Sequence, residues 1–324
     1  MCVFFKNQNN ALAGVKAKRH IQSAVTMKIA LVGPDKNTEK GIAIYTEELF
    51  TAIKRVVTNV DLVTYHRGSF RSLMKLMPRL AKYDILHIQH EGRLFGPLDG
   101  IYFLPFMLLL FCFKKGKVVI TMHTIHTQDE KLYSIHPILT FIKKNIIHRL
   151  HNLLIDLVCS NVIVHTAFLK DDLRRTSAIR NDKIIVIPHG TKQDVPLIDR
   201  SMAKKKLGVS GNIYLMIGNI GPVKGIDIIL QHAKKIGKTI LVVGTISGKG
   251  GINESYFKKL QEFVHLNSLN KLVRFQVSDE KVNLPGKLWW LYFSAADAVV
   301  MPYRVMSTSG IFINAMESGV PVVG

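Results

Sequence analysis

The chain has 324 residues, with 44 lysines and arginines against 23 aspartates and glutamates, giving a net charge of +21. This length exceeds what one hydrophobic core usually serves, so two domains are expected. Cys2, Cys112 and Cys159 show no paired spacing, which argues against a zinc knuckle or a disulfide framework and fits a reducing cytoplasm. The positive charge indicates polyanionic partners: nucleic acid, an anionic membrane surface or phosphate-rich substrates.

Residues 1–26 form a leader without acidic residues. The leader lacks the continuous apolar stretch of a secretory signal, and Met27 directly precedes the strand-like run KIALVG. We therefore expect either that the leader is disordered or that Met27 is the true start.

From residue 28 onward, short apolar runs alternate with helical patterns. Six runs predict strands in the first half: 28–33, 60–65, 84–89, 117–122, 161–165 and 183–187. Five more predict strands in the second half: 213–217, 239–243, 272–276, 297–301 and 320–323. Nearly continuous Val, Ile and Leu in such short runs indicates strands that are covered on both faces, as in doubly wound α/β domains with mostly parallel sheets.

The polar segment TKQDVPLIDRS follows IIVIPHG and predicts the domain boundary. We place the two domains at 27–195 and 196–324. The second domain ends on the strand VPVVG without a covering helix, so its C-terminal end is expected to be truncated.

Two segments raise the question of a membrane. The apolar run 101–113 contains Pro105 and is shorter than the roughly 20 residues that a bilayer span needs. It predicts either a buried helix with a basic exit or a helix that dips into a lipid interface. A helix expected over 136–158 adds a basic surface that suits anionic lipid, formed by Lys143, Lys144, His148, Arg149 and His151.

Two turns of the second half carry the strongest chemical signal. Gly218 and Gly221 follow an apolar strand and let the backbone approach a ligand, and Lys224 at the next helix start can place its ammonium on phosphate oxygens. Ser309 and Gly310 precede a helix whose N-terminus can bind further phosphate oxygens. Together the two turns predict one nucleotide-diphosphate site.

The first half offers a weaker turn and several histidines. Gly41 and Ile42 open a helix after the first strand, where the free amides suit an anion, although an ordinary strand-to-helix turn explains them equally. His87 and His90 are three apart on a strand, so they face opposite sides and form a poor metal pair. His123 and His126 follow the strand VVITM, where a catalytic or substrate-contacting role competes with simple capping. The segment GTISGKG lacks the spacing of a P-loop.

From Met27 to Gly324 the chain resembles the retaining glycosyltransferases of family 4, which have the GT-B fold. The matching segments, in chain order, are GIAIYTEEL, YDILHIQ, VVITMHT, IIVIPHG, GNIGPVKGID, and PYR followed by SGIFINAMESGVPVVG. The resemblance implies two Rossmann-like domains facing across a cleft, with the nucleotide-sugar donor on the second domain and the acceptor on the first. It also implies that no metal and no cofactor is required.

The resemblance assigns roles to single residues. It implies that Lys224 holds the diphosphate, that His123 contacts the donor sugar near the reacting carbon, and that Gly41 and Ile42 approach the phosphate. Asn219 stands where many members carry an arginine, and Met306 and Asn314 stand where they carry two glutamates. We hypothesise that Arg304, at the rim of the expected cleft, replaces part of the missing positive charge.

The sequence therefore predicts a glycosyltransferase, expected to be a hexosyltransferase, that moves a sugar with retention from a nucleotide-diphosphate sugar to a glycan, a glycolipid or another acceptor. His123 is the predicted catalytic residue, and the predicted substrate-binding residues are Gly41, Ile42, Gly218, Asn219, Lys224, Arg304, Ser309, Gly310 and Asn314. We expect a cytoplasmic protein that can bind peripherally to an anionic membrane.

Two alternatives stay open: a catalytically inactive partner subunit that binds nucleotide-sugar or glycan, and a nucleotide-sugar 2-epimerase of the same fold. Nucleic-acid binding is not expected, because the sequence has no helix-turn-helix, zinc-finger or RNP pattern.

Overall fold

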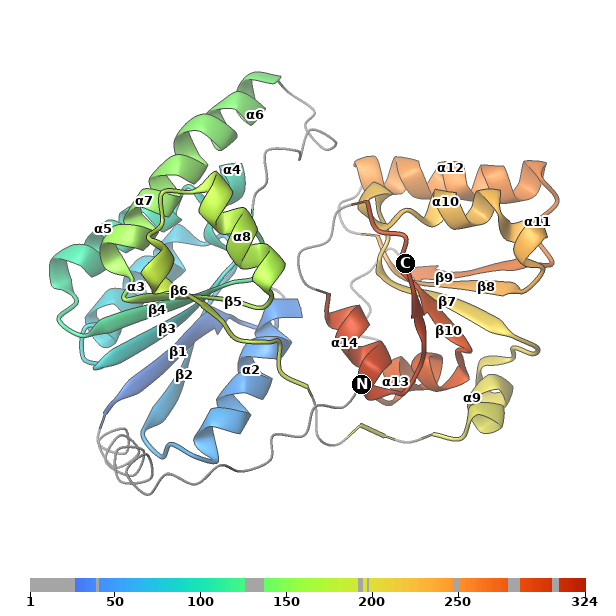
Figure 1. Cartoon of the computed structure of the whole chain (residues 1–324), viewed down its shortest axis with the longest axis horizontal. Helices are drawn as coiled ribbons and strands as arrows, with labels where there is room; N and C mark the ends of the chain where they lie inside the picture. The colour runs from blue at the N-terminus through green and yellow to red at the C-terminus, as the bar shows by residue number, and fades with distance from the viewer. Residues whose placement is uncertain are drawn as a thin grey trace. The chain divides into compact units, whose positions relative to one another are not determined.

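The computed structural model describes residues 27–38, 41–125, 137–191, 195–196, 198–246, 251–278, 286–304 and 309–324 (Figure 1). The chain divides into two compact units between Pro188 and His189, shortly before the predicted boundary at 195. Each unit is built around its own parallel sheet with helices on both faces, which confirms the doubly wound α/β fold.

The first unit contains a six-stranded sheet in the order β2-β1-β3-β4-β5-β6. The strands confirm the six predicted runs and are β1 (Ile29–Pro34), β2 (Val60–Tyr65), β3 (Ile85–His90), β4 (Lys117–Met122), β5 (Asn161–Val164) and β6 (Ile184–Val186). The helices are α2 (Gly41–Lys54), α3 (Phe70–Leu80), α4 (Pro97–Gly100), α5 (Phe103–Phe113), α6 (Pro137–Ile142), α7 (His148–Val158) and α8 (Ala167–Thr176). A single turn of π-helix, η3 (Lys143–Ile147), joins α6 to α7 and confirms one helical stretch over the predicted range.

Strand periodicity explains how the first sheet is covered. Successive residues of a strand point to opposite faces. In β1, Ala30 and Val32 belong to the main core with α3 and α5, whereas Gly33 faces α2. A Cβ at Gly33 would lie 2.8 Å from Thr46 Oγ1, so glycine lets α2 approach the strand closely. Figure 1 shows α2 on one side of the sheet and α3, α5 and α7 on the other.

The apolar run at 101–113 is mostly helix α5. Its buried residues recur at helical spacing and are Phe103, Phe106, Met107 and Leu110, while Leu108, Phe111 and Phe113 are exposed. The helix therefore packs one face on the sheet and presents the other to its surroundings. No helix in the described ranges is long and apolar enough to cross a membrane.

The second unit contains a five-stranded sheet in the order β11-β10-β7-β8-β9. The strands again match the predicted runs and are β7 (Ile213–Asn219), β8 (Thr239–Thr245), β9 (Val273–Ser278), β10 (Ala298–Val300) and β11 (Val322–Val323). The helices are α9 (Arg200–Leu207), α10 (Ile226–Gln231), α11 (Ala233–Ile236), α12 (Ile252–Leu266), α13 (Gly286–Ala295) and α14 (Gly310–Glu317). Two hydrophobic clusters fill the two faces of the sheet, one under α10, α11 and α12 and one under α13 and α14.

The strand order of the second unit reverses at β7. From β7 the chain moves to β8 and β9 on one side and then returns to place β10 on the other side. β7 pairs with β8 as far as Asn219 and Thr245, but its last pair with β10 is Leu215 with Val299. The carboxyl ends of β7 and β10 therefore separate at the point where the strand order reverses, which is where open α/β sheets bind their ligands.

Candidate functional site

The turn after β7 is fastened to the segment after β10. A 3-10 turn, η5 (Pro222–Lys224), leads into Gly225, whose φ of 62° suits glycine. A Cβ at Gly225 would lie 2.0 Å from Pro302 O, so the two segments cross in direct backbone contact. Arg304 N donates to Val223 O at 2.9 Å and closes the crossing. The turn after β7 and the segment after β10 are thus held together by backbone contacts.

Lys224 directly precedes Gly225, where the turn after β7 meets the segment after β10. Its Nζ is 3.7 Å from the centroid of the Tyr303 ring, a favourable cation–π distance. Burial lowers the pKa of Lys224 to about 8, so the ammonium is still charged at neutral pH. Burial also raises the pKa of Tyr303 to about 12, against a smaller opposing effect of its hydrogen bond with Ser309. A partly buried cation binds an anionic ligand more strongly than a fully solvated cation does, because less water has to be displaced from it.

The second predicted turn lies beside the first. Ser309 caps α14, and its Oγ accepts a hydrogen bond from Phe312 N at 3.4 Å. A Cβ at Gly218, whose φ is 129°, would meet the Ile311 side chain at 3.7 Å, so the first turn of α14 borders the end of β7. The structure thus brings the turn with Gly218 and Lys224 next to the start of α14 at Ser309 and Gly310, while their role in binding stays a prediction.

Two more predicted residues of this half lie on β7 and α14. Asn219 is exposed at the end of β7, and Asn314 is half-buried one turn into α14. Asn314 O accepts a hydrogen bond from Ser318 N at 3.0 Å. Met306, the other site of divergence from the family pattern, lies outside the described residues.

Arg304 has a structural partner that the sequence did not reveal. Its guanidinium donates to both carboxylate oxygens of Asp227, at 2.9 and 2.6 Å, and to Pro222 O at 2.7 Å. Tyr256 Oη donates to Asp227 Oδ1 at 2.5 Å. Arg304 is the main cause that holds the pKa of Asp227 below its usual range. Arg304 therefore braces the turn before Lys224, while its part in nucleotide binding stays a prediction.

In the first unit, His123 is buried directly after β4. Its Nε2 is 2.9 Å from Gln89 Oε1, and its backbone N donates to His90 O at 3.0 Å. Its ring centroid lies 4.8 Å from that of Tyr45 and 5.3 Å from that of His165. Tyr45 belongs to the first turns of α2, the helix that begins with Gly41 and Ile42. His123 and the start of α2 therefore meet at the carboxyl edge of the sheet.

The polar neighbours of His123 were missed from the sequence. Gln89 and His87 share one face of β3, and His87 Nε2 is 2.7 Å from Thr121 Oγ1. Burial lowers the pKa of His87 to about 4, so the ring is neutral. His90 points to the opposite face, where its ring lies 4.6 Å from that of Phe103. Because successive residues of a strand point to opposite faces, His87 and His90 are separated, as predicted. The sequence signal that could have identified Gln89 is a polar side chain near the carboxyl end of an apolar strand.

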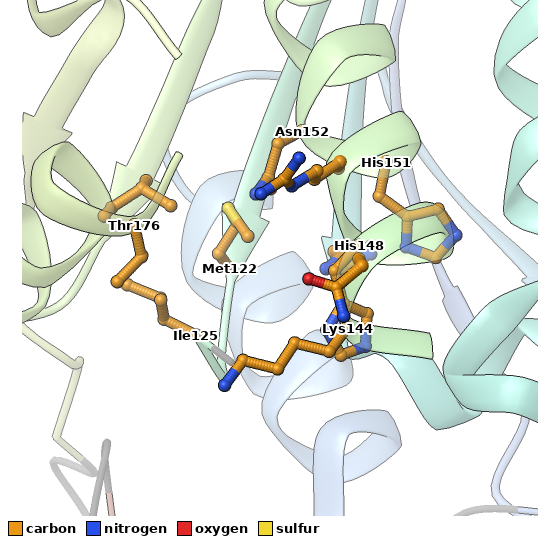
Figure 2. Close-up of a pocket in the computed structure, with 11 residues that line it drawn as sticks. Met122, Ile125, Lys144, His148, His151, Asn152 and Thr176 are labelled. Atoms are coloured by element: carbon orange, nitrogen blue, oxygen red, sulfur yellow. The ribbon is translucent and has the colours of Figure 1, made fainter. Parts of the chain in front are cut away.

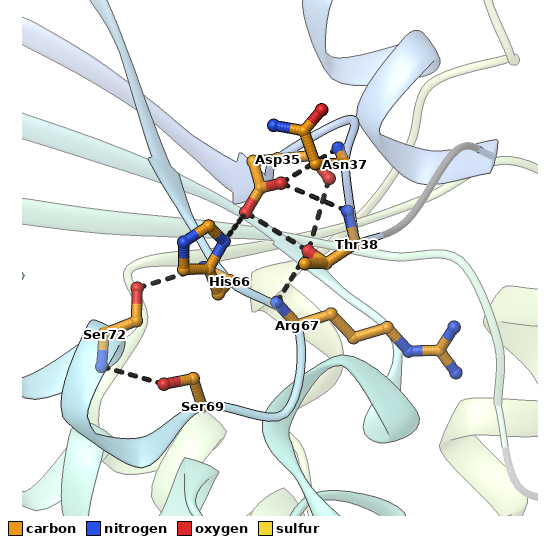
Figure 3. A network of polar contacts seen from close by, with 7 residues as sticks. All are labelled: Asp35, Asn37, Thr38, His66, Arg67, Ser69 and Ser72. Carbon is orange, nitrogen blue, oxygen red and sulfur yellow. Dashed lines mark hydrogen bonds and ion pairs between the residues drawn. The ribbon is translucent and has the colours of Figure 1, made fainter.

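A polar network fixes the loop between β1 and α2 (Figure 3). Asp35 accepts hydrogen bonds from Asn37 N at 2.9 Å and Thr38 N at 3.1 Å, and its Oδ2 lies 2.5 Å from His66 Nδ1. Thr38 Oγ1 accepts from Arg67 N at 2.9 Å. Burial alone would raise the pKa of Asp35, but the hydrogen bonds, led by that of His66, outweigh it and lower the pKa. The network ties the loop before Gly41 to the loop after β2.

Among the residues that the structure describes, no group of three His, Cys, Asp or Glu side chains is arranged to hold a metal ion. His126, the second histidine after β4, lies outside the described residues.

Known structures share this fold. Sucrose-phosphate synthase from Thermosynechococcus elongatus is similar with a TM-score of 0.66 and 15% identity, covering 91% of this chain and 80% of that one. HepE from Anabaena, in complex with UDP-glucose, is similar with a TM-score of 0.64 and 15% identity, covering 91% and 79%. At this identity the likeness concerns the fold.

A relative by sequence is D-inositol 3-phosphate glycosyltransferase from Mycobacterium leprae, which is 30% identical over 128 residues. The match covers 39% of this chain and 28% of that protein. The chain therefore matches less than a third of the length of this curated relative.

Two family models cover most of the chain in succession. Residues 34–194 match Glycosyltransferase Family 4, and residues 198–324 match Glycosyl transferases group 1. The two models meet next to the segment that joins the two structural units. Together with the paired Rossmann-like units, these matches identify the chain as a member of the family 4 glycosyltransferases with the GT-B fold.

Proposed function

We propose that this chain transfers a sugar, expected to be a hexose, from a nucleotide-diphosphate sugar to a glycan, a lipid-linked sugar or another acceptor, with retention of configuration and without a metal ion. The observation that carries the proposal is the reversal of strand order at β7 in the second unit. There the turn with Lys224, the helix start at Ser309 and the residues after β10 converge. Family membership and the HepE complex with UDP-glucose support the same donor class.

The proposed chemistry is stabilisation of the leaving group. As the bond between sugar and diphosphate breaks, negative charge grows on the phosphate oxygens. A preorganised cation and helix-terminal amides stabilise such charge most strongly when they are shielded from water. Lys224 would supply the cation, since its ammonium is partly buried yet charged at neutral pH. The free amides at the start of α14 would supply further hydrogen bonds.

The first unit would supply the acceptor side. We propose that His123 contacts the donor sugar near the reacting carbon, held in place by Gln89 and by the Tyr45 ring. Gly41 and Ile42 would approach the phosphate from the start of α2. The buried hydrogen bond to Gln89 supports this role, because it fixes the ring orientation that such a contact needs.

We also propose a cytoplasmic protein that binds peripherally to anionic membranes. The support is an exposed apolar surface on α5 and α7, where Phe111, Leu153 and Leu157 are each more than half exposed. Arg149 lies on α7 and Lys115 follows the end of α5, and both would favour anionic lipid. Binding to vesicles that weakens with salt is expected, and absence of binding at low ionic strength would remove this part of the proposal.

Incubation with a panel of nucleotide-sugars, with and without candidate acceptors, tests the activity. Release of nucleoside diphosphate is expected, and NMR of the product would report the anomeric configuration. Formation of the 2-epimer of the sugar without any acceptor would indicate the epimerase instead. Binding without turnover would favour an inactive partner subunit. This alternative stays open because Asn219 and Asn314 stand where many family members carry an arginine and a glutamate.

A further inference from the structure

The ring of His123 belongs to a buried layer of polar side chains at the carboxyl edge of the first unit's sheet. Gln89 comes from β3, His165 directly follows β5, and Tyr45 comes from α2. His87 lies two residues before Gln89 and therefore on the same face of β3. These neighbours decide which protons the imidazole of His123 can hold.

Gln89 is hydrogen-bonded to the ring through its amide oxygen. Its Oε1 lies 2.9 Å from His123 Nε2, and because a carbonyl oxygen can only accept a hydrogen bond, Nε2 must carry a proton. In a neutral imidazole the other nitrogen, Nδ1, then has no proton and acts as an acceptor. The contact therefore selects one of the two neutral forms of the ring.

Packing alone does not explain an amide at position 89. The side chain of Gln89 is fully buried, and its Nε2 has no hydrogen-bond partner among the residues that the structure describes. A buried donor without a partner lowers the stability of the fold. An apolar side chain of similar size, such as methionine, would avoid this loss. The hydrogen bond to His123 is thus what the amide provides and an apolar residue would not.

An amide also differs from a carboxylate in its effect on the ring. A carboxylate beside an imidazole favours the doubly protonated, charged form, whereas an amide oxygen accepts a hydrogen bond without a net charge. The neighbouring groups are neutral as well. Burial, together with repulsion from His165, lowers the pKa of His87 to about 4, and burial raises the pKa of Tyr45 to about 12. The layer therefore favours a neutral His123.

The charges on a nearby cavity act in the same direction. Met122 and Ile125, on either side of His123 in the chain, border a cavity that η3 and α7 also line (Figure 2). Its lining includes the permanent cations Lys144 and Arg149, and no acidic side chain occurs among the described residues that form it. A second proton on His123 would add positive charge near these cations, which disfavours the charged ring.

We propose that Gln89 is a positioning residue that keeps His123 neutral with its proton on Nε2, so that Nδ1 is the nitrogen that accepts a hydrogen bond from the donor sugar. The inference rests on the proposed function and adds the form of the ring that it needs. As the bond between sugar and diphosphate breaks, positive charge grows on the sugar. A neutral acceptor stabilises that charge, whereas an imidazolium would repel it.

The test reads the protons of His123 directly. Long-range proton–nitrogen NMR of the full chain, labelled with ¹⁵N-histidine, distinguishes the two neutral forms and the imidazolium, and His123→Ala identifies the His123 signals. The variants are Gln89→Met, which removes the acceptor, and Gln89→Glu, which keeps an acceptor of the same shape but adds charge. The matched control is Thr121→Val, which removes the hydroxyl paired with His87 on the neighbouring strand.

We expect the parent chain at pH 7 to carry its His123 proton on Nε2, and Thr121→Val to keep that form. Gln89→Met should show a mixture of both neutral forms, with kcat for sugar transfer lowered about tenfold, the usual worth of one hydrogen bond, and little change in KM for the donor. Gln89→Glu should hold two protons on the ring at pH 7. Its activity should be low there and recover as the pH rises and the ring loses the second proton.

A parent ring protonated on Nδ1 would overturn the inference, as would the same single form in the parent and in Gln89→Met. Full activity of Gln89→Glu with a doubly protonated ring would reduce Gln89 to a structural role. If Gln89→Met fails to fold, the parent spectrum and Gln89→Glu still decide. UDP binding is measured in parallel: a parent with the expected ring that binds no donor would refute the proposed function, whereas sugar transfer by a chain protonated on Nδ1 would refute this inference alone.

Discussion

Lys224 provides the sharpest test of the donor site. Lys224→Met removes the ammonium but keeps a stem of similar length to pack on Tyr303. The substitution should spare the fold, because a cation held in a partly buried position costs desolvation energy that methionine does not. If Lys224 holds the diphosphate, the variant should bind UDP more weakly by about 1.5 to 3 kcal/mol, the usual contribution of a hydrogen bond to a charged group.

The pKa of Lys224 also predicts how the affinity for UDP depends on pH. Because burial lowers it to about 8, the free protein loses this charge as the pH rises from 7 to 9. Anion binding requires the charged form, so protonation must be regained on binding above pH 8. The affinity for UDP should therefore fall by about fivefold between pH 8 and 9 and approach tenfold per pH unit above that, as the linkage of one proton requires. Lys224→Met should show no such fall, because it has no proton to regain.

The assay is calorimetric titration of UDP from pH 6.5 to 9.5 with three proteins. These are the parent chain, Lys224→Met, and Lys234→Met as a control that removes an exposed lysine from α11 of the same unit. The control should behave like the parent. If the parent and Lys224→Met bind UDP equally at pH 7, or decline in parallel as the pH rises, then Lys224 does not contact the diphosphate.

Three further outcomes follow from the geometry. Arg304→Ala should weaken UDP binding and lower the unfolding free energy by about 1 to 2 kcal/mol, because Asp227 loses its main partner; unchanged nucleotide binding would defeat the role of Arg304 in the site. The pKa of Asp227 is lowered in the folded protein, so its charge adds stability that is complete near neutral pH and lost on acidification. The difference in unfolding free energy between the parent chain and Arg304→Ala, measured by urea melts, should therefore narrow below about pH 4. His123→Ala should reduce sugar transfer by about a hundredfold with UDP affinity unchanged, whereas a parallel loss of UDP affinity would assign His123 to nucleotide binding. Gly225→Ala should lower the unfolding free energy more than Gly319→Ala does in denaturant melts. Both glycines have φ near +60°, but of the two only Gly225 faces a backbone oxygen, that of Pro302. Equal losses of stability would show that the contact between the turn after β7 and the segment after β10 tolerates a methyl group.

The strands were predictable because their signal is local. The runs at 60–65 and 117–122 agree with β2 and β4 at both ends, since each is a strand-length run rich in β-branched residues that follows a turn-forming residue, Asn59 or Gly116. The position of Gly218 and Lys224 at the carboxyl end of β7 was also predictable, because a turn with glycines and a lysine directly follows an apolar run. The π-turn η3 was not, since an extra residue within a helical pattern leaves no mark in composition.

Contacts between residues far apart in the chain could not be predicted from the sequence. Asp227 and Arg304 are 77 residues apart, and they pair because β10 returns to lie beside β7. His123 meets Gln89 and His165 for the same reason, since β3, β4 and β5 are neighbours in the sheet. Each of these residues lies close to or beyond the carboxyl end of a strand, so the strand order decides which of them meet. A single sequence does not specify that order.

The central claim is that this chain uses a nucleotide-diphosphate sugar as its donor. The most direct measurement is release of nucleoside diphosphate from UDP- and GDP-linked sugars by the parent chain and by Lys224→Met. The account predicts release from donors of one base, with a loss in the variant that follows its loss of UDP or GDP affinity. A folded parent chain that neither binds nor cleaves any of these donors would contradict it.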